Sequence, residues 1–172
     1  MAEVERVRER ERPPLKDNPY ERVMAQRKAL AERNLTGPVV IDCTQQEWFQ
    51  ARQGKLKFFL DPVSFKNTPL QQWRVFIHDI KTRSGKHRHQ GGLVIYVLEG
   101  KGYSVVEGER KDWEKGDLVL LPMKPGGVEH QHFNADPSKP AIWAAFINIP
   151  IQEYLASDLK QEEVSPDFKE GQ

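Results

Sequence analysis

Histidine placement constrains this chain more than any other feature of its sequence. Four of its five histidines form two short motifs, His87-Arg88-His89 and His130-Gln131-His132. In a β-strand, side chains two positions apart point to the same face, so each motif directs two imidazoles to one side of a strand. Neutral imidazole is a strong ligand for divalent transition metals. Two such pairs on separate strands predict a metal site inside a β-barrel.

The sequence around these motifs predicts antiparallel strands. Short apolar or alternating segments are separated by turns rich in Gly, Pro and Asp, a pattern typical of a barrel or a jelly roll. The expected strands cover residues 56–60, 72–82, 92–99, 102–106, 118–121, 128–134 and 141–149.

The order and spacing of these residues resemble the two sequence motifs of the cupin superfamily. The matching positions are His87, His89, Gly100, Gly116, Pro122, His130 and Asn134. The resemblance covers about residues 70–149. It implies an all-β fold, an antiparallel cupin β-barrel or jelly roll, preceded here by a helical N-terminal extension.

One position departs from the motif. Where cupins commonly carry a glutamate ligand, this chain has Leu93 or Val94. The resemblance thus implies a metal site of three histidines, His87, His89 and His130. Within the cupins, such a site is similar to that of gentisate and salicylate ring-cleaving dioxygenases, which use ferrous iron.

The remaining residues near the motifs leave alternatives open. The motif makes His130 the ligand and leaves three roles for His132: a residue that supports the ligands from behind, a catalytic proton shuttle or an exterior residue. A tetrahedral site of four histidines is also conceivable. Glu129, or an acid outside the motifs, is an alternative fourth ligand. His78 stands alone in an expected strand and is interpreted as structural.

The missing glutamate has a chemical consequence. Three neutral imidazoles leave a divalent ion with its full charge, which favours an anionic bidentate ligand such as a catecholate or a 2-hydroxy acid. Iron(II) with open positions is suited to activating dioxygen, whereas Mn, Zn or Ni in the same site would support other reactions. Arg83 and Arg88 are expected to be solvated, although an arginine that faced inward would bind a carboxylate well.

The chain divides by pattern into three parts. Residues 1–54 are expected to form an N-terminal arm with helices, 55–150 the barrel and 151–172 a polar tail with one helical turn near 152–159. Residues 1–17 read as a charged, loose arm.

Two helix starts are predicted before the barrel. Asn18 is suited to cap a helix that has Pro19 in its first turn and continues to about Glu32. Its length makes it marginal unless it packs on a barrel, so a homodimer is expected. A second capping pattern, Thr44 to Glu47, predicts a short helix that ends at Gly54.

Composition excludes several classes of partner. A net charge of +1 gives no strong field toward nucleic acid or a membrane surface. The longest apolar run, residues 93–98, is too short to cross a bilayer. The lone Cys43 and the charged start without an apolar signal region indicate a cytoplasmic protein.

Three hypotheses of function follow. The first is a mononuclear non-haem dioxygenase that acts on a small anionic acid, for example a hydroxylated aromatic acid. The second is a metal-dependent isomerase or lyase on a sugar or organic acid. The third is a non-catalytic cupin that binds a ligand, because one fold hosts many functions.

Overall fold

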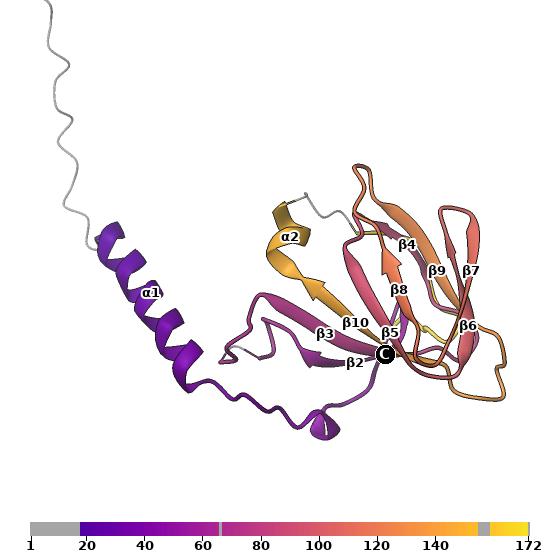
Figure 1. Ribbon diagram of the computed structural model, residues 1–172, viewed down its shortest axis with the longest axis horizontal. Coiled ribbons are helices and arrows are strands. Elements are labelled where there is room, and N and C mark those ends of the chain that lie inside the picture. The colour runs from indigo at the N-terminus through magenta and orange to yellow at the C-terminus, as the bar shows by residue number, and fades with distance from the viewer. Residues whose placement is uncertain (1–17, 66, 155–158, 172) are drawn as a thin grey trace, which may run out of the picture.

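The computed structural model describes residues 18–65, 67–154 and 159–171, and its strands form two antiparallel sheets that face each other (Figure 1). The first sheet has the spatial order β1 (Phe49–Ala51), β2 (Gly54–Leu60), β3 (Trp73–Asp79), β10 (Ile142–Asn148), β5 (Leu93–Glu99) and β8 (Leu118–Leu121). The second has the order β11 (Lys160–Glu163), β4 (Lys86–His89), β9 (Val128–Asn134), β6 (Lys101–Val106) and β7 (Glu109–Glu114). The expected antiparallel jelly roll is therefore confirmed.

All seven expected strands are present, with ends that shift by a few residues. Alternation sets their faces. In β5, Leu93, Ile95 and Val97 are buried while the residues between them are exposed. Because the pleat alternates, one strand supplies both the inner wall of the barrel and its outer surface.

The register of the first sheet stacks its inward residues in three rungs. On β3, β10 and β5, directly paired residues lie side by side on the inner face. The rungs are Arg74–Ile147–Leu93, Phe76–Ala145–Ile95 and His78–Trp143–Val97. The first rung lies at the end of the barrel where β4 turns into β5, and the third lies deeper.

Apolar side chains from both sheets fill the interior of the barrel. The core includes Leu56, Phe76, Ile95, Val97, Trp113, Leu121, Trp143 and Ile147. Trp113 comes from β7, whose other residues are exposed, so this one side chain anchors an otherwise charged strand to the core.

The first helix begins as predicted. In α1 (Pro19–Thr36), Pro19 occupies the first turn and the side chain of Asn18 accepts a hydrogen bond from the amide of Tyr20 at 3.0 Å. The helix continues four residues beyond Glu32, and none of its residues is buried. Figure 1 shows α1 standing apart from the two sheets, joined to them by an extended segment.

The predicted helix over residues 44–54 is wrong. Asp42, not Thr44, caps a single 3-10 turn, η1 (Cys43–Gln45), and the chain then enters β1. Pairing of β1 with β2 stacks the ring of Phe49 on that of Phe58, with centroids 5.4 Å apart. This packing contact forms across the β1–β2 hairpin, and it outweighs the local capping pattern.

The segment after β10 differs from a plain polar tail. α2 (Ile149–Tyr154) begins earlier than the expected turn, and β11 pairs with β4, the strand that carries the first histidine motif. The predicted loose arm of residues 1–17 lies outside the described residues. No helix in the described ranges is both long and apolar enough to cross a membrane.

Candidate metal centre

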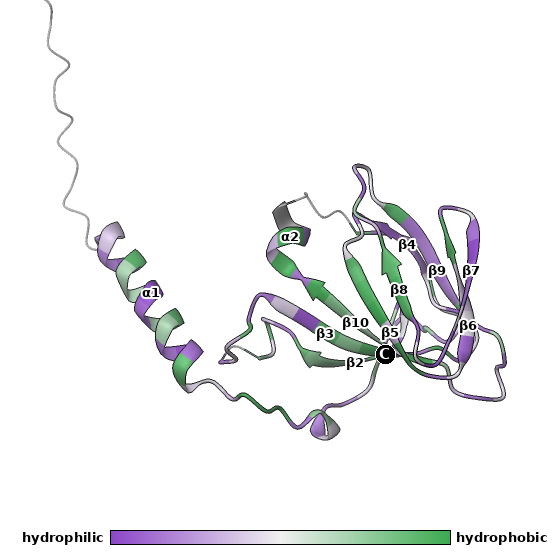
Figure 2. Ribbon diagram, viewed as in Figure 1, coloured by the Kyte–Doolittle hydropathy of each residue, from purple (hydrophilic) through white to green (hydrophobic). Residues whose placement is uncertain are grey.

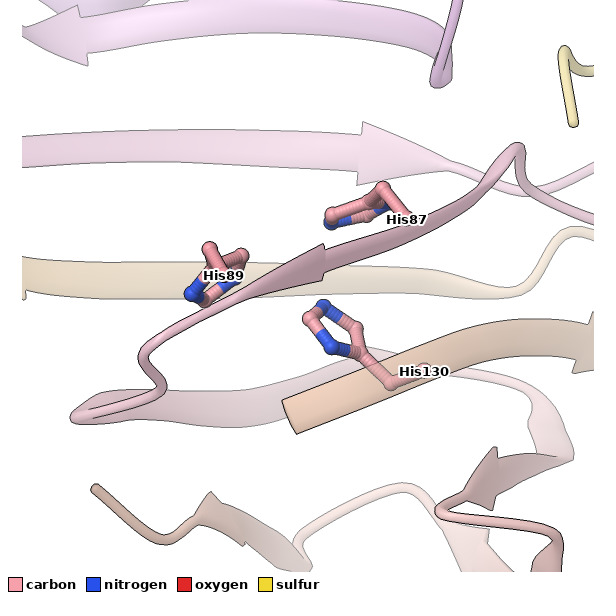
Figure 3. Close-up of side chains that lie close together, drawn as sticks. All are labelled: His87, His89 and His130. Atoms are coloured by element: carbon pink, nitrogen blue, oxygen red, sulfur yellow. The ribbon is translucent and has the colours of Figure 1, made fainter. Parts of the chain in front are cut away.

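Three histidines from two neighbouring strands meet on the inner face of the barrel (Figure 3). His87 and His89 lie on β4, and His130 lies on β9 directly opposite His87. One ring nitrogen from each lies within 4.8 Å of the others, and all three side chains are buried. The centroid of His130 is 4.3 Å from that of His87 and 4.7 Å from that of His89. Three convergent imidazoles could hold one metal ion.

Backbone carbonyls orient two of the rings. The Nδ1–H of His130 donates to the carbonyl of Val128 at 3.0 Å, and that of His87 donates to Gly85 at 3.3 Å. The proton on Nδ1 leaves Nε2 with its lone pair free. Nε2 of His130 is buried and has no hydrogen-bond partner among the described residues, as a nitrogen reserved for a metal would be.

The ring of His89 is held in the opposite sense. The amide of Gly91 donates to its Nδ1 at 3.1 Å, so the neutral ring carries its proton on Nε2. Binding a metal through Nε2 would exchange this contact for a proton on Nδ1. The turn itself requires glycine, because Gly91 has φ +82° and a Cβ there would lie 1.9 Å from the carbonyl oxygen of Pro122.

Burial keeps the three rings neutral near pH 7. Desolvation lowers the pKa of His87, lowers that of His130 well below its ordinary value, and lowers that of His89 to about 4. Proximity to His87 lowers the pKa of His89 and His130 further. Neutral imidazole is the form that binds metals, so ligation would require no cost of deprotonation.

His132 lies beside this group but outside it. Its Nδ1 is 2.7 Å from the hydroxyl of Ser104, which also accepts the indole N–H of Trp113 at 2.9 Å. With that acceptor role filled, the Ser104 hydroxyl can donate its proton to Nδ1, which places the proton of His132 on Nε2. This arrangement does not match a ligand of a four-histidine site.

The fifth buried histidine, His78, lies deeper in the barrel beside Trp143. The ring of Trp143 is 5.1 Å from His132 and 4.9 Å from His78, so the three form a column under the metal-type group. Burial lowers the pKa of His78 to about 3. Both Nε2 of His78 and Nε1 of Trp143 are buried without a partner among the described residues.

A cavity of about 260 Å³ opens on the group of three histidines. Leu56, Phe58, Phe76, Leu93 and Ile147 supply apolar walls. Among the described lining residues, Arg74 is the one with a permanent charge. The site is therefore an apolar pocket with a small number of placed polar groups, as is usual for small-molecule sites.

Of the other residues singled out from the sequence, the charged ones lie outside the cavity and Leu93 lines it. Glu129 is on the opposite face of β9 from His130 and forms ion pairs with Lys86 and Arg88, so it does not enter the cavity. Arg88 also pairs with Glu107, and Arg83 pairs with Glu163. Leu93 faces the cavity, at a position where cupins commonly carry a carboxylate.

Sequence reasoning missed Arg74. The signal was present, because Arg74, Phe76 and His78 follow the period of two that marks one strand face. The charge of an arginine in an otherwise apolar strand is usually interpreted as exposed, which hides an inward-facing guanidinium from pattern analysis.

Comparison with known proteins agrees with this architecture. Residues 76–149 match the family model of the cupin domain. A gentisate 1,2-dioxygenase of a Ralstonia species is 32% identical over 85 residues, which is 46% of this chain and 23% of the relative. A protein of Aquifex aeolicus, described as uncharacterized, is 30% identical over 105 residues, 60% of this chain and 79% of the relative.

Solved structures show the same fold. Salicylate 1,2-dioxygenase from Pseudoaminobacter salicylatoxidans, solved with gentisate, superposes with a TM-score of 0.50 at 22% identity. The superposition covers 81% of this chain and 36% of that one. This chain thus spans about a quarter of the Ralstonia enzyme and about a third of the salicylate enzyme.

Proposed function

We propose that this chain, which carries a cupin domain at residues 76–149, is a metal-dependent dioxygenase acting on a small anionic acid. The observation that carries the proposal is the buried group of His87, His89 and His130 at the cavity. The similarity to a gentisate 1,2-dioxygenase supports the class of reaction.

The donor set fits a divalent metal. Three neutral nitrogen donors, one of them a buried and unpartnered Nε2, are suited to a borderline transition metal, and we favour iron(II) over Mn, Zn or Ni. When bound, the metal supplies Lewis-acid polarisation and, as iron(II), the electrons that dioxygen chemistry requires. No carboxylate among the described residues joins the three histidines.

His132 is proposed to donate a hydrogen bond to the substrate. Ser104 and Trp113 fix its ring, and its low pKa keeps it neutral with the proton on Nε2. In that state its Nε2–H can donate a hydrogen bond to a substrate oxygen and stabilise negative charge that develops there.

A homodimer is proposed as the working form. Its support is the apolar outer surface of β5 and β8, where Tyr96, Leu118 and Leu120 are exposed. The unburied α1 offers a second apolar surface.

The test of function begins with anaerobic purification and elemental analysis. We expect one iron per chain, and oxygen uptake when gentisate, salicylate or a catechol carboxylate is supplied. His130→Ala serves as the metal-free control. Stoichiometric metal without oxygen uptake on any acid of this kind would instead support an isomerase, a lyase or a binding protein.

A further inference from the structure

Arg74 occupies a defined place relative to the three histidines. It lies on the same rung as Ile147 and Leu93, at the end of the barrel where β4 turns into β5. His89 is the last residue of β4, four residues before Leu93. The guanidinium and the histidine group therefore line one cavity from opposite sheets, with apolar side chains between them.

A buried aspartate holds this arginine. Asp61 accepts from Nε of Arg74 through Oδ1 at 3.3 Å, while its Oδ2 accepts from the amides of Val63 and Ser64 at 3.1 Å each. The turn that follows Asp61 thus fixes its carboxylate, and the residue as a whole is 7% exposed. The contact engages Nε alone, so the terminal edge of the guanidinium, with its two NH₂ groups, is left for another partner.

The charges around the cavity indicate that this partner is an anion. Arg74 is the one described lining residue with a permanent charge, and no carboxylate is among the described lining residues. The terminal edge of a guanidinium matches a carboxylate in a bidentate geometry, in an apolar cavity where such pairs are strong. About a third of the Arg74 side chain is accessible, which is sufficient for a ligand to reach it.

We propose that Arg74 is the specificity-determining residue of this cavity and binds a carboxylate on the substrate at the end remote from the metal. The inference rests on the proposed function, because it places the metal at His87, His89 and His130. Asp61 acts through Arg74 and is a positioning residue.

This assignment narrows the substrate class. The substrate carries two anionic ends, with oxygen atoms that chelate the metal at one end and a free carboxylate at the other. The walls of Phe58, Phe76 and Ile147 match an apolar or aromatic middle. A cavity of about 260 Å³ limits the substrate to a small acid.

The test compares two pairs of probes that differ by one carboxylate. They are 3,4-dihydroxybenzoate against catechol, and 2-hydroxyglutarate against 2-hydroxypentanoate. Equilibrium binding is measured anaerobically on the cobalt(II)-loaded protein by its visible absorption, and by calorimetry on the metal-free protein. The wild type is expected to bind the carboxylated member of each pair at least about ten-fold more tightly.

The variants decide whether Arg74 is responsible. Arg74→Met is expected to abolish the preference without changing the affinity for catechol or the metal content, and Arg74→Lys to retain part of it. Arg110→Met, which removes a charge from the exposed surface of β7, should behave as the wild type. An unchanged preference in Arg74→Met, or a wild type that binds metal without discriminating within either pair, overturns the inference.

The same experiment separates this inference from the proposed function. Protein that takes up no metal refutes the function. If the metal-free protein still binds the carboxylated probes and loses them in Arg74→Met, the inference stands by itself. If the protein takes up no metal and also binds neither member of a pair, the proposed function and the inference about Arg74 are both overturned.

Discussion

At the residue scale, the three histidines differ in what holds them and agree in what they offer. His87 and His130 are oriented by carbonyls, whereas His89 accepts from an amide in a glycine turn. Burial makes each a neutral nitrogen donor, because desolvation disfavours the imidazolium. The neighbouring His132 has the same neutral state but a hydroxyl partner on Nδ1, which leaves its Nε2–H to donate a hydrogen bond to the substrate.

The first prediction separates the ligand from its neighbour. His130→Ala removes a ligand, and metal affinity should fall by more than about 100-fold, beyond the effect of losing a supporting residue. His132→Gln should keep the metal and lose turnover by roughly 10²-fold to 10⁴-fold. Metal per chain is measured by elemental analysis and turnover by oxygen uptake. Full occupancy in His130→Ala together with loss in His132→Gln would make His132 the ligand.

A second prediction concerns the position that lacks a carboxylate. Leu93→Glu introduces a negative charge into the cavity beside the histidines. The charge offsets that of the metal, so the preference for anionic over neutral ligands should weaken. Leu93→Gln is the matched control, since it has nearly the same shape without the charge. Circular dichroism checks that each variant folds, and an equal preference in the two variants would remove the electrostatic argument.

Acid sensitivity provides the third prediction. The pKa of His78 is lowered to about 3 from 6.5, so the unfolded chain binds the proton more tightly than the folded one. Stability from its neutral form is complete above pH 6.5 and is lost as the pH falls toward 3. Between pH 7 and pH 5 the loss from His78 alone is about 2 kcal/mol. Denaturant titrations give the free energy of unfolding of metal-free wild type and of His78→Leu at each pH. Between pH 7 and pH 5 the wild type should lose about 2 kcal/mol more than the variant. Parallel curves would contradict the lowered pKa of His78.

At the element scale, the sequence predicted strands where apolar residues alternate and missed those without this pattern. β7 has one buried residue, Trp113, and β11 none, so neither shows a hydrophobic period. β1 was missed because a local capping pattern suggested a helix, while the stacking of Phe49 on Phe58 forms only when β1 and β2 pair as a hairpin. Both histidine motifs were informative because their spacing of two acts within a strand. Arg74 and Asp61 were not found, since their contact spans a turn and has no fixed spacing.

The hairpin of β1 and β2 gives the fourth prediction. Gly54 has φ +139°, and a Cβ there would lie 2.2 Å from Nε2 of His78. Gly54→Ala should therefore destabilise the fold by about 2–4 kcal/mol, from backbone strain and the displaced ring. Gly108→Ala is the control, because Gly108 also has a positive φ but nothing lies within 4 Å of a Cβ there. Chemical denaturation should show a clearly larger loss at Gly54, and equal losses would mean that the contact with His78 is relieved without cost.

At the scale of the whole molecule, the two outer faces of the barrel differ in chemistry. The outer face of β5 and β8 exposes Val94, Tyr96, Leu118 and Leu120, which the register places next to one another. β7 on the other sheet exposes charged residues, and Figure 2 shows this contrast between the strands. A continuous apolar face on a sheet indicates a protein contact.

The last prediction is that this apolar face joins two copies of the chain. Register pairs Leu118 with Tyr96 and Leu120 with Val94, so charges at Leu118 and Leu120 fall in the middle of the surface. Light scattering of the wild type at micromolar concentration should give twice the chain mass of 19.9 kDa, and Leu118→Glu/Leu120→Glu should give 19.9 kDa. Lys111→Glu on β7 should remain dimeric, because that charge lies on the other outer face. A wild type of 19.9 kDa refutes the dimer. A double variant that stays dimeric moves the contact to α1, whose exposed Val23, Met24 and Leu30 are the next apolar surface along the chain.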